Sequence, residues 1–273
     1  MRAGETFTKR SHGVAGLDLR LEAKSLTWLA EAEAAGGMRV AHVLSVTSDE
    51  LVEERAGSGG PSRAGAEKIG RALAHTHAAG APWYGCPPAG WDLTQGQGHV
   101  IAHSLTPLVD EGDASDSWGA YFAEWRIRAY MRQALKVGAF GTSEAQLMER
   151  VAARLEDGVY DSPQPELVGE GPARLHGDLW SGNVLWDGDS PTGAVLIDPM
   201  AHGGHAETDL AMLALFGYPY LDVVLDAYDE VSPLADGWRE RVGLHQLAPL
   251  LHHCVLFGGG YVSQTLAMAR RYA

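Results

Sequence analysis

A short apolar hairpin, flanked by oxygen-bearing side chains, constrains this chain more than any other stretch of its sequence. Asn183–Trp186 and Ala194–Ile197 are mainly apolar, and Asp187–Gly193 between them is rich in turn-forming residues. The pattern predicts two antiparallel strands joined by a turn. Pairing of the strands returns the chain to its starting point, which places Asp198 near Asn183. Two oxygen ligands then face one point, an arrangement that suits Mg²⁺ bridging nucleotide phosphates.

Asp178 adds a second constraint just before this hairpin. It lies five residues before Asn183. In phosphoryl-transfer catalytic loops, an aspartate and an asparagine at this spacing orient the attacking hydroxyl and hold magnesium, respectively. The sequence therefore predicts a phosphotransfer site containing Asp178, Asn183 and Asp198. The alternative interpretation is an ordinary hairpin with loop aspartates.

Length and charge limit the class of protein. The chain has 273 residues, 45% of them hydrophobic, which allows one large domain or two lobes. Its net charge of −14 argues against nucleic-acid binding, because a surface that follows phosphates needs a basic face. An anionic nucleotide is not excluded, since a local lysine and magnesium reverse the field within a cleft.

Cysteine content and hydropathy bear on the cellular compartment. Cys86 and Cys254 are far apart and lack metal-ligand spacing, so a disulfide framework is not predicted. No apolar run approaches the roughly 20 residues of a membrane span, and the N-terminus lacks the hydrophobic core of a signal peptide. The sequence therefore predicts a soluble cytoplasmic protein that does not bind a membrane.

The N-terminal part alternates strand and helix patterns. Thr6–Arg10 is β-prone, apolar residues recur at helical spacing over Leu19–Ala35, and short strands are predicted at Ala41–Val46 and Glu50–Glu54. This order of elements suits the small lobe of a kinase, in which a strand lysine contacts the α- and β-phosphates and pairs with a helix glutamate.

Lys9 and Glu22 are the candidates for that lysine–glutamate pair. Taken alone, each would more often be a solvated surface charge. The downstream phosphotransfer motif favours the functional interpretation of both.

The stretch Arg55–Gly65 is rich in glycine, serine and proline, which is typical of a hinge. Its glycine run, residues 57–60, lacks the Lys-Ser/Thr ending of a phosphate-binding P-loop and is better interpreted as a linker. The remaining chain is predicted to be mainly helical, with helices ending at Gly80 and covering roughly 118–135 and 144–155, and with a long irregular loop over 82–117.

Asp209 begins a further helix and is a candidate acceptor for backbone amides of the catalytic loop. A competing interpretation makes His202, His205 and Asp209 the ligands of a metallohydrolase. No further ligand and no water-activating base accompany that set.

Three motifs, taken together, carry a resemblance to a known family: His176–Asn183, Ile197–Pro199 and Glu207–Met212. They resemble the fructosamine kinase (ketosamine-3-kinase) family, which is related to aminoglycoside phosphotransferases and choline kinases. Trp180 and the Glu207–Met212 segment favour the fructosamine kinase branch. Weaker matches extend the resemblance over nearly the whole chain: Phe7–Lys9, Glu22–Ala23, Gly85–Trp91 and Phe122–Ile127.

The resemblance implies a fold, a reaction and a set of site residues. The fold is α+β and protein-kinase-like, with a shortened N-terminal β lobe at 1–56 and a mainly helical lobe at 57–273. The reaction is ATP- and Mg²⁺-dependent phosphorylation of a sugar hydroxyl on a ketoamine. The implied roles are Asp178 as catalytic base, Asn183 and Asp198 as magnesium ligands, Lys9 with Glu22 at the ATP phosphates, Glu53, Glu54 and Arg55 beside the adenine, and His176 and Asp209 as structural support.

The chain departs from the family pattern in two places. Only eight residues precede Lys9, so the first strands and the glycine-containing turn over the nucleotide are expected to be absent or shortened. A sheet edge exposed in this way predicts a homodimer formed through that edge. Ala206 stands where the family usually has a basic residue. The alternatives are therefore a kinase for another small molecule, such as an aminoglycoside or a choline-like acceptor, and a catalytically impaired nucleotide-binding protein.

Overall fold

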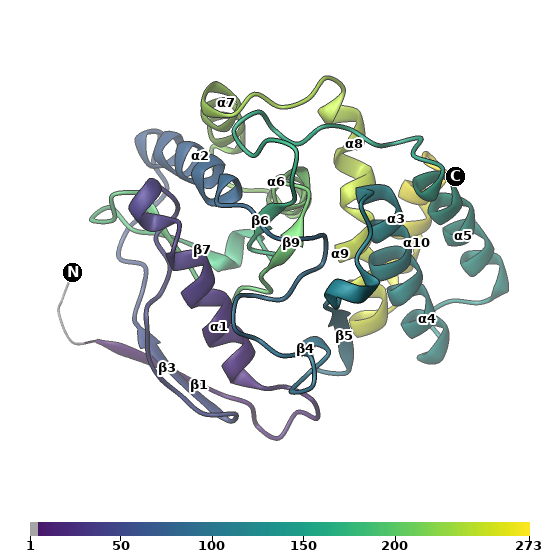
Figure 1. The fold of residues 1–273 in the computed structure, drawn as a ribbon, viewed down its shortest axis with the longest axis horizontal. Helices are drawn as coiled ribbons and strands as arrows, with labels where there is room; N and C mark the ends of the chain where they lie inside the picture. Colours follow the sequence, from purple (N-terminus) through teal and green to yellow (C-terminus); the bar gives the residue numbers. More distant parts are fainter. Residues whose placement is uncertain (1–4) are drawn as a thin grey trace.

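The computed structural model describes residues 5–273, and its N-terminal part is a small antiparallel sheet beside one helix (Figure 1). Strand β3 (Glu50–Glu54) lies between β1 (Thr6–Arg10) and β2 (Val43–Val46). Helix α1 (Leu19–Ala30) packs against β2 and β3. The predicted order of strand, helix, strand and strand is confirmed.

Helix α1 is shorter than the sequence pattern suggests. Asp18 caps its start by accepting a hydrogen bond from the Arg20 amide. The helix ends at Ala30, and a separate 3₁₀ turn, Glu33–Ala35, completes the predicted stretch. Gly36 then adopts a left-handed conformation with φ 91°, which a glycine reaches without steric cost and which ends the helical path.

Helix α2 (Arg63–Ala78) begins inside the predicted hinge Arg55–Gly65 and is capped by Ser62, so residues 63–65 of that stretch are helical. It packs along α7 (Leu221–Val231), and Gly70 permits their close approach. A Cβ atom added at Gly70 would lie 2.2 Å from the carbonyl oxygen of Val224. The α2–α7 pair therefore depends on a missing side chain at this position.

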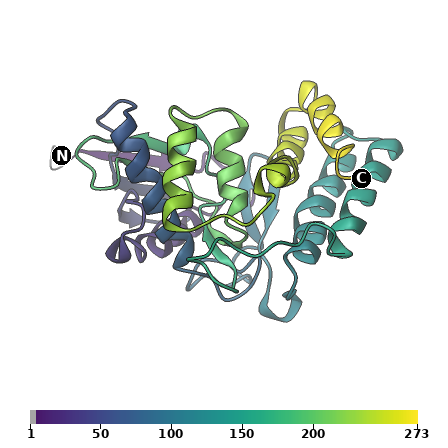
Figure 2. The ribbon, with the colours of Figure 1, turned by 90° about the horizontal axis from the view of Figure 1, so that it is seen from above.

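The apolar interior forms two main cores. Figure 2 shows two groups of elements, the purple, blue and green ones on the side of the N-terminus and the teal and yellow helices on the side of the C-terminus. The first contains Leu26, Leu51, Ile69, Leu196 and Tyr228, so it joins the N-terminal sheet and α1 to α2, α7 and the central hairpin. Because this core takes residues from both sides of residue 56, burial alone does not separate lobes at 1–56 and 57–273, and that division stays a prediction.

The second core belongs to the C-terminal helices and the helices of the middle segment. The elements are α3 (Trp118–Phe122), a π-helical turn (Ala123–Arg128), α4 (Ala129–Lys136), α5 (Thr142–Glu156), α8 (Trp238–His245), α9 (Leu247–Phe257) and α10 (Gly260–Ala269). The helix predicted over 118–135 is therefore present, with a π-helical turn at its centre. Among residues 5–273, no helix combines the length and the apolar character that a membrane crossing needs.

The prediction of an irregular segment over 82–117 is wrong in its centre. Strands β4 (Gly98–Ile101) and β5 (Ser104–Pro107) form an antiparallel hairpin. Its turn places Ala102 at φ 53°, in the left-handed region that glycine or asparagine usually occupies. The turn therefore lacks the sequence signal by which a tight hairpin is recognised.

Two further strand pairs frame the predicted phosphotransfer loop. Strands β7 (Val184–Trp186) and β8 (Ala194–Leu196) pair with Val184 opposite Leu196, as the apolar pattern predicts. Strands β6 (Ala173–Leu175) and β9 (His202–Gly204) form the second pair, and α6 (Glu207–Leu215) follows directly. Residues 176–183 follow β6, and residues 197–201 follow β8. The two segments run side by side.

Candidate active site

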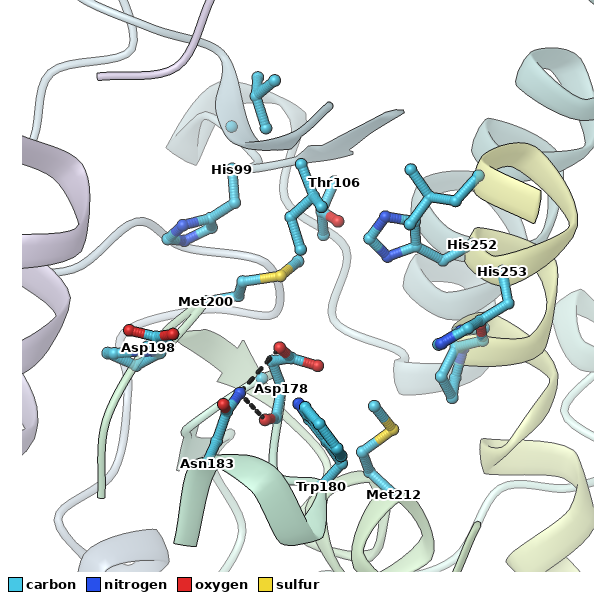
Figure 3. A pocket seen from close by; sticks show the side chains of 18 of the residues that line it. His99, Thr106, Asp178, Trp180, Asn183, Asp198, Met200, Met212, His252 and His253 are labelled. Atoms are coloured by element: carbon cyan, nitrogen blue, oxygen red, sulfur yellow. Dashed lines mark hydrogen bonds between the residues drawn. The ribbon is translucent and has the colours of Figure 1, made fainter. Parts of the chain in front are cut away.

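Asp178 and Asn183 are in direct contact. The Asn183 side-chain nitrogen donates to the Asp178 carboxylate and to the Asp178 carbonyl oxygen, both at 2.9 Å (Figure 3). The turn between them, Ser181–Asn183, is a single 3₁₀ turn, which brings two residues five positions apart within hydrogen-bonding distance. The amide oxygen of Asn183 takes no part in this pair.

A buried carboxylate, Asp209, fixes the start of the loop. Its two oxygens accept hydrogen bonds from the backbone amides of His176 at 2.7 Å and Gly177 at 3.0 Å, as expected from the sequence. His77 Nε2 lies 3.2 Å from the same carboxylate. Burial alone would raise the pKa of Asp209, but the His77 hydrogen bond and the neighbouring histidines and amides hold it below its ordinary value.

His176 connects the loop to the segment that carries Asp198. Its Nε2 donates to the carbonyl oxygen of Ile197 at 3.0 Å, and its Nδ1 accepts from the Asp178 amide at 3.2 Å. These two bonds require a neutral ring, and burial lowers the pKa of His176 accordingly. His176 therefore positions both neighbouring segments through one side chain.

Gly177 is a loop residue that no other amino acid replaces without strain. Its φ is 83°, and a Cβ atom there would lie 2.1 Å from the Met200 carbonyl oxygen. The backbone of the loop consequently runs against the Ile197–Met200 segment, which is how the two predicted halves of the site meet.

Asp198 and Lys9 complete the cluster from the other side. Lys9 Nζ lies 2.7 Å from Glu22 Oε2 and 3.2 Å from Asp198 Oδ1. Asp198 has φ 51°, a conformation uncommon outside glycine, and strain of this kind concentrates at functional sites. The lysine–glutamate pair predicted from the sequence is thus present, and it contacts the predicted metal ligand.

Burial governs the protonation of three carboxyl groups at this site. It raises the pKa of Asp178 and of Glu53 to about 7, and it raises the pKa of Glu22 against the opposing effect of the Lys9 charge. For Lys9, burial would lower the pKa, but the carboxylates of Glu22 and Asp198 outweigh it and raise the pKa above its ordinary value. A carboxyl group with a pKa near neutrality is suited to proton transfer.

Glu53, Glu54 and Arg55, the residues predicted beside the adenine, lie outside the cavity that contains Asp178. Glu53 is 3% exposed and lies close enough to Glu22 for their charges to interact. Glu54 pairs with Arg39 at 2.6 Å, and Arg55 lies 4.0 Å from Glu5. Their adenine-side role stays a prediction.

One cavity of about 680 Å³ holds the predicted catalytic residues. Asp178, Asn183 and Asp198 lie on one side of it, and His252 and His253 of α9 face them from the other (Figure 3). Further parts of the wall come from α1, the β4–β5 hairpin, the π-helical turn, α4, α6 and α10. The volume is in the range of small-molecule sites.

Sequence reasoning missed the whole wall opposite Asp178. Thr106 of β5 and Arg126 of the π-helical turn line the cavity, and so do His252, His253 and Phe257 of α9. The apolar residues of α9 recur as they do in a helix that packs in a core, so their pattern does not indicate a cavity wall. The signal available was the pair of adjacent histidines followed one turn later by phenylalanine.

The three ligands of the metallohydrolase alternative, His202, His205 and Asp209, do not form a metal-ligand cluster in the part of the chain that the structure describes. Asp209 bonds the catalytic-loop amides, and His202 Nδ1 donates to the Met200 carbonyl oxygen at 2.7 Å. Within residues 5–273, the histidine and carboxylate groups that approach one another as metal ligands do are His205, Glu207 and His245. Arg241 already holds both oxygens of Glu207, at 2.6 and 2.9 Å.

Comparison with known proteins agrees with this geometry. The chain matches the fructosamine kinase family model over residues 3–272. It is similar to a Thermobifida fusca protein of known structure assigned as a fructosamine-3-kinase, with 41% identity, a TM-score of 0.81, and 98% of this chain and 85% of that chain covered. The ADP-bound aminoglycoside phosphotransferase APH(2'')-Ib shares the fold at 14% identity and a TM-score of 0.54, with 93% and 83% covered.

A curated relative, the probable ketoamine kinase of Enterococcus faecium, is 31% identical over 204 residues, which is 75% of this chain. The chain spans 66% of that relative's length. The fold is α+β and protein-kinase-like, as the resemblance implied. By sequence and by structure, the chain belongs to the fructosamine kinase family.

Proposed function

We propose that the chain is an ATP- and magnesium-dependent kinase that phosphorylates a sugar hydroxyl of a ketoamine. The observation that carries the proposal is the meeting of Asp178, Asn183, Asp198 and the Lys9–Glu22 pair at one cavity. Each group has a distinct part in phosphoryl transfer, and the family's named members include ketoamine kinases.

Asp178 is the proposed base. Its carboxylate is held by Asn183 and sits in a site where its pKa is about 7. At neutral pH a large share of the carboxyl groups is ionised, so Asp178 can orient the acceptor hydroxyl and take up its proton. His176 and Asp209 act on the reaction only by holding the loop that carries this carboxylate.

The donor set fits magnesium and a nucleotide. The Asn183 amide oxygen and the Asp198 carboxylate are hard oxygen ligands of the type that Mg²⁺ prefers, and Lys9 is a cation held at the cavity edge. When bound, MgATP supplies the phosphoryl group, and its magnesium ion offsets the charge on the phosphates. Lys9 would exchange part of its contact with Asp198 for the phosphates and remain paired with Glu22.

The direct test is phosphate transfer from ATP to 1-deoxy-1-(methylamino)fructose in the presence of magnesium. Wild-type turnover, together with loss of turnover in Asp178→Asn, is the expected result. Efficient turnover of an aminoglycoside or choline instead would redirect the acceptor assignment. Binding of MgATP without transfer to any acceptor would favour the nucleotide-binding alternative, and near wild-type transfer by Asp178→Asn would remove Asp178 from the mechanism.

We also propose that two copies of the chain associate through the β1 edge of the sheet. Strand β1 is an edge of the described sheet, and Phe7 on it is 48% exposed. Light scattering measures the mass in solution directly. A monomer at all concentrations would exclude the dimer, and a dimer that Phe7→Lys dissociates would support it. The cytoplasmic location stays a prediction.

A further inference from the structure

The cavity that holds Asp178 opens past a connected group of aromatic rings, here called the aromatic rim. It consists of Trp180, Phe216, His253, Phe257 and Tyr261, and each of them lines the cavity. Trp180 lies two residues after Asp178 in the catalytic loop. The other four come from the end of α6, from α9 and from the start of α10. The rim therefore begins at the proposed base and leads away from it.

The rings contact one another in an ordered path. Trp180 meets Phe216 edge to face, with centroids 6.4 Å apart, and Phe216 lies 5.3 Å from His253. His253 in turn lies 5.5 Å from Phe257 and 4.8 Å from Tyr261. These separations are those of interacting aromatic pairs. The rim is a continuous surface rather than a scatter of exposed side chains.

His253 is fixed at the centre of the rim as a neutral ring. Its Nδ1 lies 2.6 Å from the Pro249 carbonyl oxygen, to which it donates. Burial lowers its pKa. The ring orientation is set by the backbone of α9, so the surface is preformed and needs little ordering to bind a ligand.

The outer rings remain accessible to solvent. Phe257 is 66% exposed, Phe216 42% and Trp180 38%. Three exposed aromatic side chains connected at the mouth of a cavity form a contiguous apolar patch, and such patches mark ligand-binding grooves or interaction sites. Their contact with water is unfavourable until an apolar group covers them.

Charge indicates which ligand suits the rim. Residues 247–269, which form α9 and α10, contain no Asp, Glu, Lys or Arg. The carboxylates that border the cavity lie elsewhere, on α1, the catalytic loop, the Asp198 segment and α6. A polycationic acceptor such as an aminoglycoside would find no counter-charge on this wall. An apolar or aromatic group needs none, and it can leave water there without the desolvation cost that a charged group has.

We infer that the aromatic rim is a subsite for the substituent on the ketoamine nitrogen, and that it selects apolar or aromatic substituents. The inference rests on the proposed function, because it places the sugar hydroxyl at Asp178 and the amine side toward Phe216, His253 and Phe257. It adds a substrate class to that function: small ketoamines whose amine carries a hydrocarbon or an aromatic ring.

Two ketoamines that differ only at the nitrogen substituent test the inference. The probes are 1-deoxy-1-(benzylamino)fructose and 1-deoxy-1-(methylamino)fructose. We expect wild-type protein to bind the benzyl compound about tenfold more tightly in calorimetry, as partial burial of a phenyl ring against other rings implies. The ratio of kcat/KM for phosphorylation should follow the same order.

Variants of the rim should reduce that preference. We expect Phe257→Ala and Phe216→Ala each to lower the benzyl-to-methyl ratio to about threefold or less, since each removes one ring of the surface. Phe257 is mostly exposed, so its truncation should leave the fold intact. Val159→Ala is the matched control, because Val159 is 52% exposed and lies outside the cavity lining; it should keep the tenfold ratio.

The outcomes separate this inference from the proposed function. Equal affinities for the two ketoamines in the wild type, or an undiminished ratio in Phe257→Ala, would overturn the rim as a subsite. A wild-type dimer that Phe257→Ala converts to a monomer would assign the surface to contact between copies and would also overturn it. If neither compound is phosphorylated, the proposed function fails, while the calorimetric ratio still decides whether the rim selects aromatic substituents.

Discussion

Replacing Asp209 by asparagine tests how one buried carboxylate holds the catalytic loop. The side chain is 1% exposed and accepts hydrogen bonds from the His176 amide at 2.7 Å and the Gly177 amide at 3.0 Å. His77 Nε2 lies 3.2 Å from the oxygen that His176 also uses. Asparagine has nearly the same shape but only one acceptor oxygen, so its NH₂ group must face at least one of these donors.

The cost follows from that mismatch. We expect asparagine to keep its oxygen where the His176 and His77 donors converge and to turn its NH₂ group toward the Gly177 amide. The variant then loses one hydrogen bond to a charged acceptor, worth about 1.5–3 kcal/mol, and gains an unfavourable contact between two donors. We expect the free energy of unfolding to fall by about 3 kcal/mol, which for a chain of this size lowers Tm by roughly 6–12 °C.

The same change should impair catalysis more than nucleotide binding. Gly177 directly precedes Asp178, so a shift of its amide moves the proposed base. A displacement of about 1 Å costs about 100-fold in rate, and we expect kcat to fall by at least that factor while the KM for ATP changes less than about threefold. Thermal unfolding and steady-state kinetics measure both effects. Asp226→Asn, at an exposed position of α7, is the control. A wild-type Tm with kcat within about twofold would refute the reasoning.

Three further substitutions address the remaining groups of the site. Asp178→Asn should abolish turnover yet stabilise the ligand-free protein at high pH. Burial raises the pKa of Asp178 from 3.8 to about 7, so its ionisation opposes folding increasingly from about pH 4 to pH 7. Urea titrations with chelator present measure the free energy of unfolding. The variant should exceed the wild type by up to about 4 kcal/mol at about pH 8 and by much less at about pH 5. Lys9→Met should raise the KM for ATP at least about tenfold, because the cation held by Glu22 and Asp198 is lost; an unchanged KM would remove Lys9 from the phosphate site. Asp198→Asn should raise the magnesium concentration for half-maximal rate at least about tenfold, and an unaltered magnesium dependence would contradict its assignment as a ligand.

The central hairpin and the catalytic loop were predictable because their signals are local. Asp178 and Asn183 are five residues apart, and one 3₁₀ turn brings them together. The β7–β8 pairing follows from two apolar runs and the turn between them. The Lys9–Glu22 pair also joins neighbouring elements, a strand and the helix after it. The hairpin and the loop needed only short-range geometry, whereas the Lys9–Glu22 prediction also depended on the phosphotransfer motif far downstream.

The elements that were missed depend on contacts between distant parts of the chain. His77 reaches Asp209 across 132 residues of sequence, and nothing near His77 distinguishes it from a core histidine. The β4–β5 hairpin turns at Ala102 without glycine or asparagine. The shared core of the sheet with α2 and α7 depends on the missing side chain of Gly70. Propensity and periodicity carry no information about such pairings.

Helices α9 and α10 show which additional signal a sequence contains for a cavity wall. Helical periodicity cannot separate an apolar residue in a core from one that lines a cavity, which is why α9 reads as core. A helix at the surface of a soluble protein usually has charged residues on its outer face, yet residues 247–269 have none although Phe257 is 66% exposed. Complete burial does not explain this absence of charge, because Phe257 is exposed. On α10 the outer face carries exposed uncharged polar residues, Ser263 and Gln264. On α9 the exposed residue is Phe257, which supports the aromatic rim as the acceptor side of the site.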